Sequence, residues 1–187
     1  IPLRTLPPNP DQLIFLGYRG SVSFGTYQKP THPNSIDDID LIGCFINPIE
    51  GYFGFDKIVP VHYELKHNKW DCIHYEFKKM IYLLMKGNPN VLSTLWLPEK
   101  HIIYSSPTWN TIRRNRNLFV SKFVYSAFSG YANDQLRRMT HMAFEGYMGP
   151  KRKALVNKYG YDTKNAAHLI RLLSMGIEFL QEKKLFV

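Results

Sequence analysis

Three aspartates crowd the entry to an apolar segment, and their type and spacing suit the binding of a metal ion. Asp37, Asp38 and Asp40 lie directly against the apolar residues of the strand predicted for 38–46. Carboxylates are poor strand formers and are costly to bury unless a cation pairs with them. Alternate side chains of a strand share a face, so Asp38 and Asp40 project together while Asp37 faces away and is interpreted as structural. We therefore expect Asp38 and Asp40 to bind Mg²⁺ or Mn²⁺, the alternative being a solvated strand entry.

A glycine–serine turn precedes these carboxylates and is suited to holding phosphate groups. Gly20 and Ser21 follow a short apolar strand predicted for 12–18, and residues 21–27 predict one or two helical turns. Such a turn directs backbone N–H groups and a hydroxyl at an anion, and glycine lets a phosphate approach the backbone closely. Arg19 either contacts a triphosphate or is an ordinary surface residue. A phosphate-binding turn followed by a carboxylate pair on the next strand favours triphosphate chemistry.

Taken together, Gly20-Ser21 and Asp38-Ile39-Asp40-Leu41 resemble the signature of the nucleotidyltransferases of the DNA polymerase β superfamily, with a somewhat longer spacer. The chain is similar in particular to the bacterial and phage group linked to RNA-repair gene clusters. The shared stretches are YRGS, SIDDIDLIG, KGNPNVLSTLWL, GYANDQLRRM and KYGYDTKNAAHLIRLL. They span nearly the whole chain. The resemblance implies an α+β fold, in which a nucleotidyltransferase-type mixed sheet with flanking helices is followed by a helical subdomain.

The superfamily normally has a third carboxylate on a neighbouring strand. The favoured residue is Asp71, at the start of the strand predicted for 69–75, and the alternative is Glu64 in the strand predicted for 59–67. In the scheme that the resemblance implies, Asp38 and Asp40 bind both metal ions. Asp71 then binds one metal ion and acts as general base for the acceptor hydroxyl.

The composition shift near residue 100 predicts two subdomains packed as one unit, an α/β subdomain over 1–104 and a helical subdomain over 105–187. Helical periodicity begins at Glu76, and Gly87 is placed to end that helix. Two N-cap–proline pairs predict further helix starts, at Asn88–Pro89 and Ser106–Pro107. Three more helices are predicted in the second half, over 121–145, 151–158 and 163–184.

The last predicted helix carries a polar stripe. Lys164, His168 and Arg171 recur at helical spacing and lie on one face. This stripe is either a solvated face or, as the resemblance implies, the part of the helical subdomain that contacts the triphosphate or the acceptor backbone. The residues expected in the core on the opposite face are Ala166, Ile170, Leu173 and Ile177.

The charge balance points to a polyanionic partner. The chain has 24 Lys and Arg against 15 Asp and Glu, a net charge of +9. Three basic clusters, at 113–122, 137–138 and 151–153, are interleaved with aromatic residues. Basic residues with aromatics suit an RNA acceptor, and the alternative is a helical bundle with an aromatic core and a charged outer face. The aromatic residues concerned are Tyr125, Phe128, Tyr131 and Tyr147.

The cysteines and the lack of a long apolar stretch indicate where in the cell the protein is expected. Cys44 and Cys72 form no metal-binding pattern and are predicted to be buried thiols in a reducing compartment. No apolar stretch approaches the length of a membrane span, so we expect no membrane association and a cytoplasmic location, in a bacterial or phage-infected cell.

The function expected from the sequence is transfer of a nucleoside monophosphate from an NTP to a hydroxyl, most simply an RNA 3′ end, with release of pyrophosphate. One alternative is transfer of AMP from ATP to a protein side chain, as in toxin–antitoxin pairs. Another is a non-catalytic protein of the same fold that binds nucleotide or RNA. The intact Asp38–Asp40 pair favours catalysis, since a binding protein has no need of a costly carboxylate pair.

Overall fold

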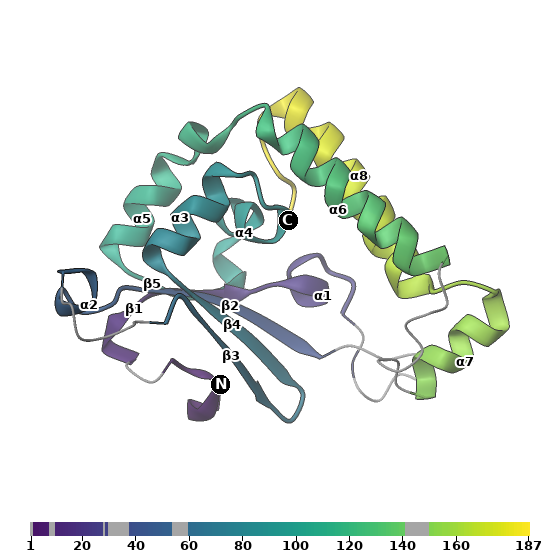
Figure 1. The fold of residues 1–187 in the computed structure, drawn as a ribbon, viewed down its shortest axis with the longest axis horizontal. Helices are drawn as coiled ribbons and strands as arrows, with labels where there is room; N and C mark the ends of the chain where they lie inside the picture. Colours follow the sequence, from purple (N-terminus) through teal and green to yellow (C-terminus); the bar gives the residue numbers. More distant parts are fainter. Residues whose placement is uncertain (1, 8–9, 28, 30–37, 54–59, 141–149) are drawn as a thin grey trace.

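The structure of the chain, a computed structural model, describes residues 2–7, 10–27, 29, 38–53, 60–140 and 150–187. In this part of the chain, five strands form one mixed sheet in the order β3-β4-β2-β1-β5 (Figure 1). The strands are β1 (Leu13–Tyr18), β2 (Ile39–Phe45), β3 (His62–His67), β4 (Trp70–Glu76) and β5 (Ile102–Ser105). Strands β2 and β4 are parallel, and the other neighbouring pairs are antiparallel. The predicted α+β fold is confirmed.

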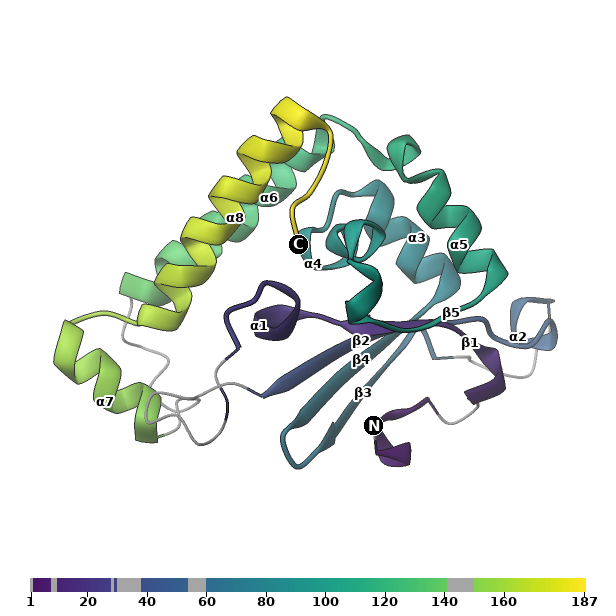
Figure 2. The same cartoon turned by 180° about the vertical axis from the view of Figure 1, so that it is seen from behind.

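Helices α3, α4 and α5 lie over one face of the sheet, while α6 and α8 run side by side and extend past the end of the sheet at which α1 lies (Figures 1 and 2). The α-helices are α1 (Gly20–Ser23), α2 (Glu50–Phe53), α3 (Phe77–Met85), α4 (Pro89–Leu92), α5 (Pro107–Arg114), α6 (Phe123–Thr140), α7 (Pro150–Tyr159) and α8 (Thr163–Glu182). The 3₁₀ helices are η1 (Leu3–Thr5), η2 (Pro10–Gln12), η3 (Ser93–Trp96), η4 (Glu99–His101) and η5 (Arg116–Phe119).

The helix boundaries follow the signals in the sequence. The Asn88 side chain accepts hydrogen bonds from the backbone N–H groups at the start of α4, and the Ser106 hydroxyl accepts one from the Trp109 N–H at the start of α5. Gly87 ends α3 with a φ of +66°, a conformation that favours glycine. The helix starts predicted at Asn88 and Ser106 are therefore confirmed.

Strand alternation divides the core into two clusters. Ile42 and Ile73 face the larger cluster, between the sheet and the helices, where the Phe15 ring stacks on Trp109 of α5 at 4.4 Å between centroids. Leu41 and Cys72 face a smaller cluster on the other side of the sheet. Both cysteines are buried and free, as predicted. The side chains that share a face with Ile42 and Ile73 thus lie beneath the helices, and this is the face that carries the site.

The structure corrects the expected core face of α8. Ile170, Leu173 and Ile177 are 67%, 48% and 57% exposed, whereas a neighbouring stripe of α8 is buried. That buried stripe consists of Leu172, Met175, Gly176 and Phe179. Apolar residues occupy two sides of this helix, so periodicity alone does not determine which side packs against the neighbouring helix.

Strand β5 is an element that the sequence does not predict. Its four residues pair with β1 and form one edge of the sheet, and the division expected after residue 104 falls inside this strand. A four-residue strand has too few residues for a clear alternating pattern. In addition, partly exposed positions lie on both of its faces, so neither face is marked as buried.

Candidate functional site

Two of the predicted carboxylates lie side by side at the same level of the sheet. Asp40 on β2 pairs in register with Asp71 on the parallel strand β4, so both side chains project from the helix-covered face. The Arg19 guanidinium lies 3.7 Å from an Asp40 oxygen and 3.9 Å from an Asp71 oxygen. The Lys66 ammonium on β3 lies 3.2 Å from the other Asp71 oxygen. The carboxylate pair is therefore already neutralised in part by the chain's own cations.

The surroundings of Asp40 shift the pKa of its carboxyl. Burial raises the pKa of its carboxyl above the ordinary value, the Arg19 charge opposes this shift, and the Asp71 charge adds to it. The Lys164 charge also lowers this pKa, and the Asp38 charge also raises it. A carboxylate that burial and like charges disfavour gains more than a solvated one from a nearby cation.

The Gly20–Ser21 turn packs directly against Asp40. The backbone N–H of Arg19 donates to the Asp40 carbonyl at 3.0 Å, which fixes the start of α1 beside β2. Gly20 has a φ of +62°, and a Cβ at this position would collide with the Asp40 carboxylate. Glycine is thus required twice, by conformation and by space. The buried Ser21 hydroxyl has no hydrogen-bond partner among the described residues, which leaves it available to a ligand.

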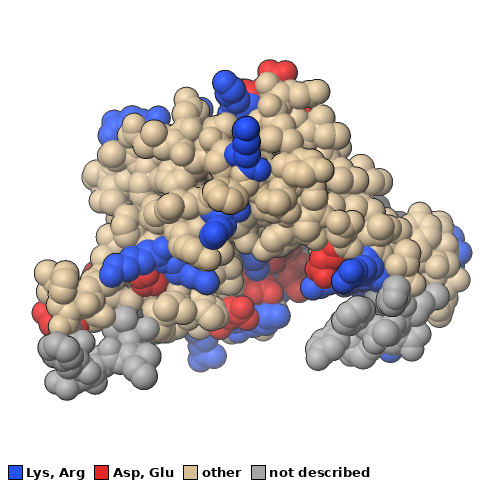
Figure 3. All heavy atoms as spheres, turned by 45° about the horizontal axis from the view of Figure 1, so that its top comes forward, with Lys and Arg blue, Asp and Glu red and all other residues tan. Residues whose placement is uncertain are grey.

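The polar stripe of α8 faces this turn across a cavity of about 530 Å³. The residues of the cavity wall that matter here are Gly20, Ser21 and Asp40 on one side and Lys164, His168 and Arg171 on the other. The same three α8 residues also line a second cavity, of about 610 Å³. Figure 3 shows a recess at the lower centre of the molecule in which Asp and Glu atoms and Lys and Arg atoms lie close together. The stripe is partly buried rather than a freely solvated face.

Burial shapes the charges of the α8 stripe. Burial lowers the pKa of His168 to about 4, and the cations Arg171, Lys164 and Arg152 act in the same direction, so the imidazole is neutral at pH 7. Burial also lowers the pKa of Arg171 to about 10, which leaves the guanidinium charged. The Arg171 guanidinium stacks 4.0 Å from the Phe24 ring centroid, and its Nε has no hydrogen-bond partner in the described ranges. The α8 side of the cavity therefore carries the charged Arg171 guanidinium, stacked on Phe24, and the neutral His168 imidazole.

An ion pair that the sequence did not reveal orients the start of α8. Asp162 is 2% exposed, accepts from the backbone N–H groups of Lys164 and Asn165, and binds Arg152 of α7 through two guanidinium nitrogens, the shorter contact being 2.5 Å. Asp before Thr163 is a common N-cap, which is the signal that could have identified it. Arg152, one of the cations expected to contact RNA, is also the ion-pair partner of Asp162.

Other predicted cations also have structural partners. Arg113 donates to Glu99 at 2.8 Å and to the Leu97 carbonyl, and Arg116 donates to the Leu95 carbonyl. Arg138 and Asp134 form an ion pair of 2.9 Å within α6. Among the interleaved aromatics, Phe128 is buried, Tyr125 and Tyr131 are exposed, and Tyr147 lies outside the described residues.

The remaining predicted acidic residues are placed as follows. Asp38 is exposed just before β2, and Glu64 is exposed on β3, in register with Ile73 rather than with Asp71. Asp37 lies outside the described residues. Within the described ranges, no three His, Cys, Asp or Glu side chains converge as a group that could hold a metal ion. The structure therefore brings Asp40 and Asp71 together and leaves Asp38 and Glu64 outside that pair. The residues that sequence analysis missed are Lys66, which contacts Asp71, and Phe24, which supports Arg171.

Comparison with known proteins identifies the family of the chain. No helix in the described residues is long and apolar enough to cross a membrane. No curated protein matches the sequence. A family model described as RlaP, the RNA repair pathway DNA polymerase beta family, matches residues 9–186 and therefore nearly the whole chain. The mixed sheet also carries Asp40 and Asp71 beside a glycine–serine turn. Because the family model covers nearly the whole chain, the chain belongs to the RNA repair pathway DNA polymerase beta family.

Proposed function

We propose that the protein is a metal-dependent nucleotidyltransferase that moves a nucleoside monophosphate from an NTP to the 3′ hydroxyl of an RNA. The observation that carries the proposal is the pairing of Asp40 with Asp71 on parallel neighbours, directly beside the Gly20–Ser21 turn. Membership of a DNA polymerase beta family with a role in RNA repair supports both the reaction and the acceptor. The basic character of the chain, +9 overall, supports polyanionic substrates.

In the proposed reaction the acceptor hydroxyl oxygen attacks the α-phosphorus of the NTP. One P–O bond forms to the acceptor, the bond between the α-phosphorus and the α,β-bridging oxygen breaks, and pyrophosphate leaves with the bonding electrons. The hydroxyl proton passes to a carboxylate oxygen, for which Asp71 is the proposed base. Ser21 donates its hydroxyl to a phosphate oxygen, and the Arg171 and Lys164 side chains offset the negative charge of the triphosphate.

The chemistry of the carboxylates fits a hard divalent cation. Asp40 and Asp71 offer oxygen donors, and the Arg19 guanidinium already brings positive charge within 4 Å of both. Mg²⁺ typically takes one or two carboxylates and completes its shell with waters and substrate phosphates. In the proposal Asp40 and Asp71 hold the ion, and Asp38, which is exposed at the strand entry and lies outside the pair in this structure, turns toward the ion as a further ligand when it binds. Bound there, Mg²⁺ or Mn²⁺ would withdraw charge from the phosphoryl group and lower the pKa of the acceptor hydroxyl.

Two carboxamide variants test the reaction. Asp40→Asn and Asp71→Asn should each lower transfer roughly a thousandfold or more, because several kcal/mol of transition-state stabilisation are lost with the carboxylate. The assay combines Mg²⁺ or Mn²⁺, each labelled NTP, and either RNA or protein acceptors. Glu64→Gln is the matched control and should keep activity. Full activity in Asp71→Asn with loss in Glu64→Gln would make Glu64 the third carboxylate, and label on protein alone would make the enzyme a protein modifier. Bound NTP without transfer in the wild type would identify a non-catalytic binding protein.

Alanine variants of two glycines distinguish a steric collision from backbone strain near the Gly20–Ser21 turn. Gly20→Ala should lower kcat/KM for transfer by about a hundredfold, because the added methyl displaces the Asp40 carboxylate from its position. Gly25 has a similar φ of +68°, but a methyl group added there would meet no atom within 4 Å, so Gly25→Ala suffers the same strain without the collision. Transfer kinetics and thermal melting of both variants give the comparison. Equal loss in the two variants would contradict the proposed role of the Gly20–Asp40 contact.

Arg171 provides the test of the α8 stripe. Arg171→Ala should weaken NTP binding roughly 10- to 100-fold, because a charge-assisted contact to phosphate is lost. Arg114, an exposed arginine of α5 outside the cavities, gives the matched control Arg114→Ala, which should bind NTP as the wild type does. Calorimetric titration with NTP measures both. Wild-type affinity in Arg171→Ala would remove α8 from the nucleotide site.

A further inference from the structure

Lysines and aromatic rings alternate along α3, on a surface where Tyr82, Lys86 and Phe123 are exposed and Lys79 is half-buried. We define the lysine–aromatic face as Lys79, Tyr82 and Lys86 of α3 together with Phe123 at the start of α6. The Lys79 ammonium lies 5.6 Å from the Tyr82 ring centroid, and the Lys86 ammonium lies 5.7 Å from Tyr82 and 5.4 Å from Phe123. The order on the surface is therefore cation, ring, cation, ring.

The fold itself does not account for this face. Met80 and Leu84 are the residues of α3 that are fully buried, whereas Tyr82 and Phe123 are 52% and 58% exposed. Among the described residues no carboxylate lies within ion-pair distance of Lys79 or Lys86. Two large rings exposed beside cations without acidic partners form a surface suited to an anionic, ring-bearing ligand.

We propose that the lysine–aromatic face binds the single-stranded RNA that carries the acceptor hydroxyl, an inference that rests on the proposed function. A single strand alternates phosphates with unpaired bases, so lysines can contact successive phosphates while the rings stack on successive bases. Paired bases in a duplex are unavailable for such stacking. An acidic protein segment would satisfy the lysines but would leave the two rings without a specific partner.

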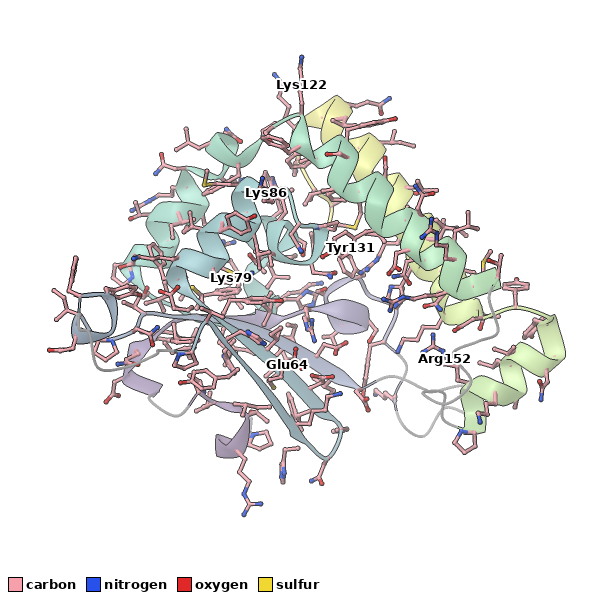
Figure 4. The ribbon with its side chains drawn as sticks, viewed as in Figure 1. Glu64, Lys79, Lys86, Lys122, Tyr131 and Arg152 are labelled. Carbon is pink, nitrogen blue, oxygen red and sulfur yellow. The ribbon has the colours of Figure 1, made fainter. Side chains whose placement is uncertain are left out.

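The face is continuous with the catalytic side of the molecule. Lys86 is followed by Gly87, where a Cβ would lie 3.1 Å from Val124, so the end of α3 and the start of α6 are in close contact. The next residue, Asn88, donates to the Tyr131 hydroxyl at 2.6 Å. Figure 4 shows Lys79 and Lys86 along α3, with Tyr131 to the right of both.

Tyr131 in turn lines the cavity of about 610 Å³. That cavity shares Lys164, His168 and Arg171 with the cavity that contains Asp40. A strand bound on the face can thus continue past Tyr131 and present its 3′ end toward the carboxylates.

The test measures RNA binding separately from transfer. A labelled single-stranded RNA of about 12 nucleotides, within the usual site sizes, is titrated by fluorescence anisotropy at several salt concentrations. Lys79→Ala/Lys86→Ala should weaken binding and lower the magnitude of the salt slope by about 1.4, the loss of two phosphate contacts. Tyr82→Ala/Phe123→Ala should weaken binding at least about tenfold and leave the salt slope unchanged. The matched control is Lys158→Ala/Tyr159→Ala, which removes another lysine–ring pair, 5.0 Å apart on α7, and should bind as the wild type does.

The outcomes test RNA binding by the lysine–aromatic face separately from the proposed transfer reaction. Wild-type RNA affinity in both face variants, or equal weakening in the α7 control, would overturn the inference. Equal competition by duplex RNA would also overturn it, because stacking requires unpaired bases. Calorimetry should show unchanged NTP affinity in the face variants. If the face variants lose RNA binding while the wild type transfers label to no acceptor, the RNA-binding face stands and the proposed reaction fails.

Discussion

The parallel pairing of β2 with β4 is the constraint on which the rest of the site depends. It puts Asp40 and Asp71 at the same level of adjacent strands, on the face that the helices cover. Two carboxylates so placed repel each other, and burial adds to the cost of the Asp40 charge. Arg19 and Lys66 offset that cost within the chain. The pair is therefore held in an electrostatic balance that a divalent cation and a triphosphate can alter, which is the physical basis of the proposed function.

The helical half completes the site by bringing positive charge to the opposite wall. The buried pair of Asp162 with Arg152 joins α7 to the first turn of α8, and from that turn the polar stripe extends toward the Gly20–Ser21 turn. Because His168 is neutral at pH 7 while Arg171 stays charged, the wall can combine hydrogen bonding with charge neutralisation. The sheet supplies acidic residues and the helices supply cations, so the site exists only where the two halves meet.

The sequence predicts the features that depend on local rules. Strand alternation selects Asp38 and Asp40, and the superfamily resemblance adds Asp71 with Glu64 as the alternative. N-cap residues followed by proline predict the starts of α4 and α5. What it does not predict depends on tertiary packing. The predicted core face of α8 is wrong because Ile170, Leu173 and Ile177 mimic a buried stripe. Lys66 meets Asp71 only through pairing of β3 with β4, and the lysine–aromatic face forms only where α3 meets the start of α6.

The most direct measurement of the central claim is a crystal structure of the protein with Mn²⁺ and a non-hydrolysable NTP, with the metal located by its anomalous signal. The account predicts Mn²⁺ bound by Asp40 and Asp71, and triphosphate oxygens between the Gly20–Ser21 turn and Arg171. Metal held by Glu64 instead of Asp71, or a nucleotide bound away from the Gly20–Ser21 turn, would contradict it.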